Sequence, residues 1–201
     1  MVSERAAARR VAAFDFDGTL TRRDSLAPFL ARVVGWPRLA AAALRDAPAF
    51  AAVAAGRGDR DLTKERLLVR LLAGVERERL RRLGTEYGAL LAQGRIRPEM
   101  RARVDWHRAQ GHELVIVSAS LDVYLEEVAR RLLFDAVLCT SLEYAGDDRC
   151  TGRLLGGNCR AQAKADRLRN YLAGETAELW AYGDSAGDDA MLAMADHPVR
   201  V

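Results

Sequence analysis

The strongest constraint on the fold is a set of three short apolar runs that each end in acidic, hydroxyl or glycine residues. The runs are "RVAAFDF" at 10–16, "HELVIVS" at 112–118 and "ELWAYG" at 178–183. Such runs are typical of strands buried on both faces of a parallel sheet. Helical spacing follows at 121–132 and 191–194, and 159–173 is also helix-like. This alternation predicts an α/β fold with a doubly wound parallel sheet, whose sites lie beyond the carboxyl ends of the strands.

The long segment after the first run predicts an inserted helical unit. Residues 24–95 hold no strand pattern and consist of amphipathic stretches separated by glycine and proline. We therefore expect a core domain of residues 1–23 and 96–201, with a small all-helical cap at 24–95 inserted after the first strand. A hairpin at 138–156 and a last strand at 199–201 are expected within the core, and whether a tail follows is left open.

Composition limits the classes of protein that the chain can belong to. Its 201 residues are half apolar with a net charge of +3, which suits one core and a small accessory unit. No compact basic block indicates nucleic-acid binding, no apolar run is long enough to span a membrane, and the start "MVSERAAARR" does not resemble a signal peptide. The cysteines match no zinc or redox spacing and are expected to be buried or idle thiols of a cytoplasmic protein: Cys139, Cys150 and Cys159.

The histidines and tryptophans suggest no site of their own. We expect the three histidines not to cluster and, since none accompanies a serine in a nucleophile elbow, not to form a hydrolase triad; they are His107, His112 and His197. We expect the tryptophans to lie in the core: Trp36, Trp106 and Trp180.

Acidic residues follow the first and third apolar runs. In an extended chain Asp15 and Asp17 point the same way, so both can face one point above the strand end. The third run leads into "GDSAGDD", which contains Asp184 and Asp188. If the two strands are neighbours the clusters meet, and hard carboxylate oxygens of this kind suit Mg²⁺.

With two further motifs, these clusters resemble those of the haloacid dehalogenase superfamily of aspartate-nucleophile phosphatases. The motifs are "DFDGTLT", "VIVSAS", Lys164 and "GDSAGDD", in the family's order. The helical insertion and the stretch "TGRLLGGNCRAQAK" at 151–164 resemble the phosphoserine-phosphatase-like branch more narrowly.

The resemblance implies a Mg²⁺-dependent phosphomonoesterase that acts on a small phosphorylated metabolite. In this family's scheme Asp15 attacks phosphorus and becomes an aspartyl phosphate, while Asp17 protonates the leaving oxygen and later deprotonates water. The metal is then held by the Asp15 carboxylate, the Asp17 carbonyl and Asp184.

The same resemblance implies how phosphate is bound. Ser118 and Lys164 hold the non-bridging oxygens, and backbone N–H groups near Gly18 and Ala119 assist. Asp188 orients Lys164 or a water on the metal.

Each assignment has a purely structural alternative. Asp15 and Asp17 also suit a turn that caps the next segment, and Ser118 suits the N-cap of the helix near residue 121. Lys164 also suits a solvated helix position, although only two of the 31 basic residues are lysines, which favours a specific role.

Specificity is expected to come from polar groups of the cap, because every phosphate ester offers the same phosphoryl group. The candidates are Asp24, Lys64, Arg66 and Arg70. Asp24 lies where phosphoserine phosphatases carry a glutamate for the substrate ammonium group, but Asp24 and Ser25 also suit a helix N-cap, the favoured interpretation. Lys64 equally suits a surface position.

The substrate stays open at this stage. Gly187 and the pair Ala119–Ser120 depart from the pattern of phosphoserine phosphatases. Phosphoserine, a sugar phosphate, a biosynthetic intermediate and a phospholipid head group all remain candidates. Two other functions are possible for the same motifs: phosphoryl transfer to another metabolite, and metal-binding regulation without catalysis. The oligomeric state is open as well.

Overall fold

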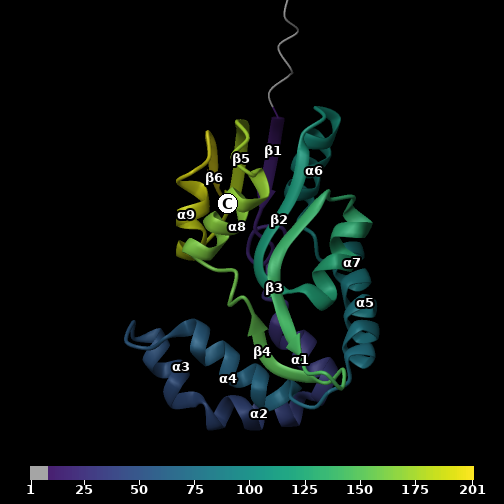
Figure 1. The fold of residues 1–201 in the computed structure, drawn as a ribbon, viewed down its shortest axis with the longest axis vertical. Coiled ribbons are helices and arrows are strands. Elements are labelled where there is room, and N and C mark those ends of the chain that lie inside the picture. Colours follow the sequence, from purple (N-terminus) through teal and green to yellow (C-terminus); the bar gives the residue numbers. More distant parts are fainter. Residues whose placement is uncertain (1–8) are drawn as a thin grey trace, which may run out of the picture.

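The computed structural model describes residues 9–201 (Figure 1), so that most of the starting segment "MVSERAAARR" lies outside the described residues. The strands are β1 Arg9–Phe14, β2 Glu113–Leu121, β3 Ala136–Tyr144, β4 Cys150–Leu155, β5 Ala177–Gly183 and β6 His197–Arg200. The helices are α1 Leu26–Val34, α2 Trp36–Arg45, α3 Ala47–Ala54, α4 Arg60–Leu72, α5 Arg77–Gly94, α6 Pro98–Ala109, α7 Asp122–Leu132, α8 Gln162–Leu172 and α9 Asp189–Leu192, with a short 3₁₀ helix at Ala186–Asp188.

The sheet confirms the expected doubly wound architecture. Its strand order is β4-β3-β2-β1-β5-β6, and all neighbours are parallel except β3 and β4. The three apolar runs are the adjacent strands β2, β1 and β5, so their carboxyl ends meet at one edge of the sheet. The expected hairpin is β3 and β4, and the expected last strand is β6.

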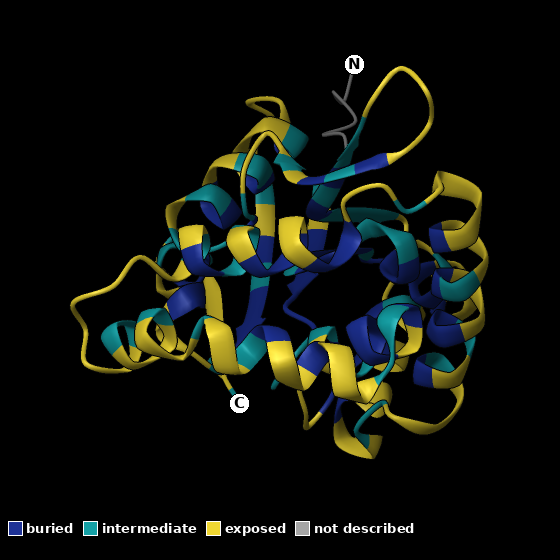
Figure 2. Ribbon diagram, turned by 90° about the horizontal axis from the view of Figure 1, so that it is seen from below, coloured by how far each residue is buried: buried dark blue, intermediate teal, exposed yellow. Residues whose placement is uncertain are grey.

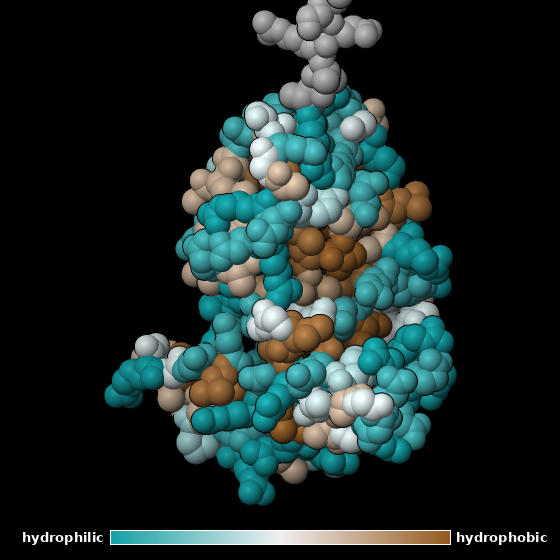
Figure 3. Space-filling view, in the orientation of Figure 1, coloured by the Kyte–Doolittle hydropathy of each residue, from teal (hydrophilic) through white to brown (hydrophobic). Residues whose placement is uncertain are grey.

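Both faces of β1 are buried, which explains its uninterrupted apolar sequence. Ala12 and Phe14 pack into one apolar cluster, whereas Val11 and Ala13 pack into another on the opposite face. The surrounding helices turn their buried sides inward and their exposed sides to solvent (Figure 2). Apolar side chains gather over the central strands between α7 and α8, with hydrophilic surface around them (Figure 3).

Helices α1–α5 fill the segment expected to be an insertion, and α5 lies along α7 of the core (Figure 1). Glycines make this contact close. A Cβ at Gly84 would lie 2.0 Å from the Val123 carbonyl oxygen, and a Cβ at Gly88 would lie 2.4 Å from the Tyr124 oxygen. Larger residues at these positions would push the two helices apart.

The β3–β4 hairpin forms a second contact with the insertion. A Cβ at Gly152 would lie 2.4 Å from the Val69 Cα of α4, and Gly152 has a φ of +79°, which favours glycine. The helical insertion is therefore attached to the core by α5 on one side and by the hairpin on the other.

Two of the three tryptophans contradict the expectation of core positions. Trp36 is 63% exposed and Trp106 is 43% exposed, while Trp180 is partly buried against the core. A helix can carry one exposed aromatic residue and still keep its periodic apolar face. The sequence pattern therefore did not show that Trp36 and Trp106 are exposed.

The expectation that the histidines do not cluster is wrong. His107 Nδ1 lies 2.8 Å from His112 Nδ1, and His107 Nε2 lies 2.8 Å from the Tyr182 hydroxyl. The Trp180 ring packs between His112 and His197, with ring centroids 4.4 Å from each. The tight turn between α6 and β2 and the pairing of β5 with β6 bring these rings together.

The three cysteines are buried free thiols, as expected. Among residues 9–201, no helix combines the length and apolar character needed to cross a bilayer.

Candidate active site

The site is centred on the carboxyl end of β1, the central strand of the described sheet. The Asp15 backbone N–H donates to the Tyr182 carbonyl at 2.9 Å, so pairing with β5 continues to the first carboxylate. The side chain of Asp15 is buried, with 5% of the residue exposed. A buried carboxylate at this point requires a specific partner.

Lys164, at the start of α8, is that partner. Its Nζ lies 2.5 Å from Asp15 Oδ1 and 2.5 Å from Asp188 Oδ1, and only 3% of the residue is exposed. Burial by itself lowers the pKa of Lys164, but the two carboxylates outweigh burial and hold the pKa above its ordinary value. Lys164 is therefore not the solvated helix residue of the alternative interpretation.

Asp188 is fixed by the turn that follows β5. Its Oδ2 accepts hydrogen bonds from the backbone N–H and the hydroxyl of Ser185, both at 3.0 Å, while Oδ1 accepts from Lys164. Burial acts to raise the pKa of Asp188, but the ammonium of Lys164 outweighs it and lowers the pKa below its ordinary value. Asp188 thus orients Lys164 toward Asp15.

Three carboxylates form a cluster suited to a divalent cation. One oxygen from each of Asp15, Asp184 and Asp188 lies within 4.8 Å of the others. Gly18 makes room for this arrangement, because a Cβ there would lie 2.3 Å from Asp184 Oδ2, and its φ is +89°. The acidic residues that follow the first and third apolar runs therefore meet as expected. Their hard carboxylate oxygens fit Mg²⁺.

Asp17 points its carboxylate to a different set of partners. Its Oδ2 accepts from the hydroxyls of Ser120 at 2.6 Å and Ser25 at 2.8 Å, and its Oδ1 lies 3.4 Å from the Thr21 hydroxyl. Burial raises the pKa of Asp17 to about 6, and the serine hydrogen bonds act against this rise. A carboxyl with such a pKa can donate and accept a proton near neutral pH.

Ser118 lies at the end of β2, beside this network. Its Oγ accepts the backbone N–H of Ser120 at 3.2 Å, and α7 begins at Asp122 without a side-chain cap. The N-cap alternative for Ser118 is therefore wrong, because β2 continues to Leu121 before the helix starts.

The central residues line one cavity of about 400 Å³. From the core come six of the residues assigned a role above: Asp15, Asp17, Ser118, Ala119, Lys164 and Asp188. From the insertion come Asp24 and Lys64, with an apolar wall that includes Phe50 and Leu67. The core thus supplies the charged wall of the cavity, and the insertion supplies a wall with both charged and apolar side chains.

Lys64 connects the two sides. Its Nζ donates to the Ala119 carbonyl at 2.5 Å and to Asn158 Oδ1 at 2.7 Å. The amide of Asn158 in turn donates to Asp61 Oδ1 at 2.7 Å. Burial lowers the pKa of Lys64 to about 8. These contacts hold α4 against the end of β2 and against the segment that leads into α8.

The other cap candidates differ in position. Asp24 lines the cavity and also accepts the Ala27 N–H at 3.1 Å, which agrees with the favoured capping role. Arg66 is exposed and Arg70 pairs with Asp46 at 2.9 Å, and neither lines the cavity. Both lie on α4 at about 200° and 240° around the axis from Lys64, so they face away from the site.

Several residues of the site were not assigned a role from the sequence. Four of them line the cavity: Arg60, Ser120, Asn158 and Arg160. Ser25 does not line it but donates to Asp17. Asn158 and Arg160 lie within the stretch that leads into Lys164, which was a usable signal. No sequence signal indicated the roles of Arg60 and Ser25, because these roles depend on how the insertion folds over the core.

This constellation defines an α/β enzyme that presents paired aspartates, a lysine and a serine at the carboxyl ends of three adjacent parallel strands. Residues 12–193 match the haloacid dehalogenase-like hydrolase family. The chain belongs to this family of hydrolases.

Related proteins agree with the assignment. Protein CicA of Caulobacter vibrioides is 38% identical over 184 residues, which cover 92% of this chain and 82% of that protein. A histidinol-phosphatase of Neisseria meningitidis is 29% identical over 136 residues, covering 65% of this chain and 61% of the relative.

Solved structures share the architecture. A protein of unknown function from Bordetella pertussis superposes with a TM-score of 0.82 at 27% identity, covering 96% of this chain and 90% of that one. A phosphoserine phosphohydrolase-like protein from Francisella tularensis gives 0.68 at 16% identity, covering 94% and 84%. The second likeness shows the fold alone.

Proposed function

We propose that the chain is a Mg²⁺-dependent phosphatase that hydrolyses a small phosphate monoester through an aspartyl phosphate on Asp15. One observation carries the proposal: Asp15, Asp17, Ser118 and Lys164 line the same cavity of about 400 Å³. A nucleophile, a proton donor and two phosphate-binding groups are what this reaction needs within reach of one phosphorus atom.

The proposed roles follow from the contacts. Burial raises the pKa of Asp15, while the ammonium group of Lys164 acts against this rise and orients the carboxylate for attack. The same ammonium group and the Ser118 hydroxyl hold the phosphoryl oxygens. Asp17 protonates the leaving oxygen and then removes a proton from the water that opens the aspartyl phosphate, two roles that suit a pKa of about 6.

The Asp15 and Asp184 carboxylates and the Asp17 carbonyl would hold the Mg²⁺. When bound, the metal neutralises the repulsion between the Asp15 carboxylate and the phosphate dianion. Titration calorimetry with MgCl₂ tests this binding separately from turnover. Wild-type protein should bind the metal, and Asp184→Asn should bind it at least about tenfold more weakly.

The cavity wall formed by the insertion supports a leaving group with both apolar and charged parts. Phe50 and Leu67 offer apolar contact, while Asp24 suits an ammonium group and Arg60 a carboxylate. Amino-alcohol and amino-acid phosphates therefore belong in any substrate screen, with histidinol phosphate and phosphoserine as two members. A set of such esters assayed with Asp24→Ala and Lys64→Ala would show whether these side chains set the substrate ranking.

The deciding experiment is hydrolysis of a generic aryl phosphate with and without Mg²⁺. Metal-dependent release of inorganic phosphate is expected for the wild type and should be lost in Asp15→Asn. Asp189→Asn, which changes an exposed carboxylate of the motif GDSAGDD, is the control and should remain active. Equal activity of Asp15→Asn and the wild type would exclude Asp15 as the nucleophile, and transfer of phosphate to an added alcohol without release would indicate a phosphotransferase.

A further inference from the structure

A second cavity lies where the chain crosses between the core and the helical insertion. Its volume is about 960 Å³, and it is lined by both crossing segments, 21–24 and 94–98. These segments are bridged to each other, since Thr21 pairs with Ile96 and the Arg97 N–H donates to the Leu20 carbonyl at 2.9 Å. We call it the crossover cavity.

The crossover cavity is lined by five arginines and a single carboxylate, Asp24. The arginines come from the two crossing segments and α1: Arg22, Arg23, Arg32, Arg95 and Arg97. Glu99, outside the lining, pairs with Arg97 at 2.9 Å and with Arg22 at 3.4 Å.

The remaining three arginines have no ion pair among residues 9–201. They are Arg23, Arg32 and Arg95. Like charges gathered in one concave site repel each other, and an anion bound there would relieve this repulsion.

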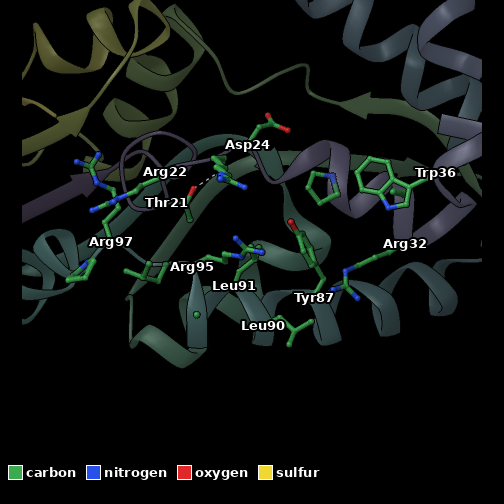
Figure 4. A pocket seen from close by; sticks show the side chains of 16 residues that line it. Thr21, Arg22, Asp24, Arg32, Trp36, Tyr87, Leu90, Leu91, Arg95 and Arg97 are labelled. Atoms are coloured by element: carbon green, nitrogen blue, oxygen red, sulfur yellow. Dashed lines mark hydrogen bonds between the residues drawn. The ribbon is translucent and has the colours of Figure 1, made fainter. Parts of the chain in front are cut away.

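One end of the cavity is aromatic. Trp36 lines it with 63% of its surface exposed, and the Arg32 guanidinium lies 5.0 Å from the centre of the Tyr87 ring. Figure 4 shows Arg22 and Arg97 at one end, Trp36 and Arg32 at the other, and Arg95 between them. Guanidinium groups and an exposed indole thus face a common space.

We propose that the crossover cavity binds a small organic anion with at least two phosphate or carboxylate groups and a planar or apolar part. Arginine forks match phosphate and carboxylate oxygens bidentately, and three unpaired guanidinium groups require more than one negative charge. The exposed face of Trp36 suits stacking of a ring. A concave site of this volume holds a metabolite-sized ligand, of which a nucleotide is one representative.

The crossover cavity is connected through short contacts to the residues around Asp17. Arg97 Nη1 donates to the Gly18 carbonyl at 3.0 Å, immediately after Asp17. On the other side, Tyr87 donates to the Ser25 carbonyl at 3.1 Å, and Ser25 holds Asp17. An anion that binds both crossing segments favours the arrangement in which Asp17 has these partners, so the two sites are energetically coupled.

Binding is tested by isothermal titration calorimetry in a buffer freed of divalent metal with a chelating resin, using pyrophosphate, citrate and ATP as separate probes. We expect at least one to bind with 1:1 stoichiometry. Arg95→Gln and Arg23→Gln should each weaken that binding about tenfold or more, because a hydrogen bond to a charged group is lost. Trp36→Ala should weaken ATP but not pyrophosphate, which separates the ring contact from the anion contact.

Two control variants complete the test. Ser118→Ala changes the phosphate end of the catalytic cavity, and Arg153→Gln removes an exposed arginine of β4 that lines no described cavity. Both should bind the probes as the wild type does. The proposal is overturned if no probe binds at about 10 mM, well above typical metabolite affinities. It is also overturned if Ser118→Ala abolishes binding while the arginine variants keep it, since the probe would then occupy the catalytic cavity.

The coupling is tested by the KM for an aryl phosphate with and without a saturating probe. At the same probe concentration we expect a change of about fivefold in the wild type and a smaller change in Arg95→Gln, which binds the probe more weakly. This measurement rests on the proposed phosphatase activity, whereas the calorimetry does not, so failure of one is distinguishable from failure of the other. An unchanged KM in the presence of a bound probe would overturn the coupling.

Discussion

The catalytic cavity and the crossover cavity differ in how their positively charged side chains are paired. In the catalytic cavity Lys164 is buried and lies 2.5 Å from each of two carboxylates. In the crossover cavity five arginines face one lining carboxylate. A buried charge is unstable without a partner from the same chain, whereas a solvated guanidinium is stabilised by water until a ligand arrives. The first cavity is therefore arranged for chemistry on a bound phosphate, and the second for recognition of an anion from solution.

The largest effect that sharpens this comparison is expected from Asp15→Asn. The variant keeps the shape of the side chain but removes the anionic nucleophile, so kcat should fall by about 10⁴-fold or more. Steady-state hydrolysis of an aryl phosphate measures the loss, and calorimetry with the probe of the crossover cavity should show unchanged binding. If probe binding falls as well, the two cavities are not separate sites.

Lys164→Arg should have the next largest effect. The lysine occupies a compact buried position between Asp15 and Asp188, which a planar guanidinium cannot fill in the same geometry, so we expect kcat to fall by about 10²-fold. Arg169→Lys is the matched exchange at an exposed position of the same helix and should leave kcat unchanged. Full activity of Lys164→Arg would show that only the charge of this residue matters in the catalytic cavity.

Ser120→Ala tests the hydrogen bond to Asp17. The variant removes a donor at 2.6 Å from the carboxylate, and we expect about a tenfold loss in kcat, in line with the worth of a hydrogen bond to a charged group. Bound phosphate analogues should retain their affinity, since Ser118 and Lys164 are unchanged. A loss of analogue affinity with an unchanged kcat would instead place Ser120 in phosphate binding.

Acid pH should destabilise the fold through a group that lines neither cavity. Burial, helped by the neighbouring His112, lowers the pKa of His107 from its ordinary value of 6.5 to about 4. As pH falls from about 6.5 to about 4, the unfolded chain takes up the proton before the folded chain does, so stability falls over this range by about 1–3 kcal/mol and then levels off.

Urea unfolding at several pH values measures this loss. His107→Gln should flatten the dependence, whereas His197→Gln, at an exposed histidine, should leave it in place. A dependence that persists in His107→Gln would assign it to another group. Comparisons between the two cavities are best made above pH 6.5, where His107 causes no change of stability with pH.

The smallest effect is expected from Arg95→Gln without any ligand. Because the guanidinium is exposed and has no ion pair among the described residues, the melting temperature should change by less than about 1 °C and kcat by less than about twofold. Differential scanning calorimetry and the aryl phosphate assay measure the two quantities. A strongly destabilised variant would show that Arg95 has a structural role, and the contrast between the cavities would fail.

The sequence was most informative where structure is local or repeated along the chain. The three apolar runs predicted β1, β2 and β5, because a strand buried on both faces must be apolar throughout. Since parallel strands end at the same edge of a sheet, Asp15 and Asp184 were expected to meet if their strands are neighbours. The places of Ser118, Lys164 and Asp188 in the site were implied by the family resemblance.

Tertiary structure decided what depends on distant segments meeting. The contact of Lys64 with Ala119 and Asn158 joins three segments, and the direction of each side chain is set by how α4 packs on the hairpin. The same is true of the His107–His112 pair and of exposed Trp36, both of which contradicted expectation. The arginines of the crossover cavity are scattered over residues 22–97 and resemble any solvated arginine in the sequence. Only the fold brings them to one concave surface, because long-range packing, and not local propensity, determines which exposed charges become neighbours.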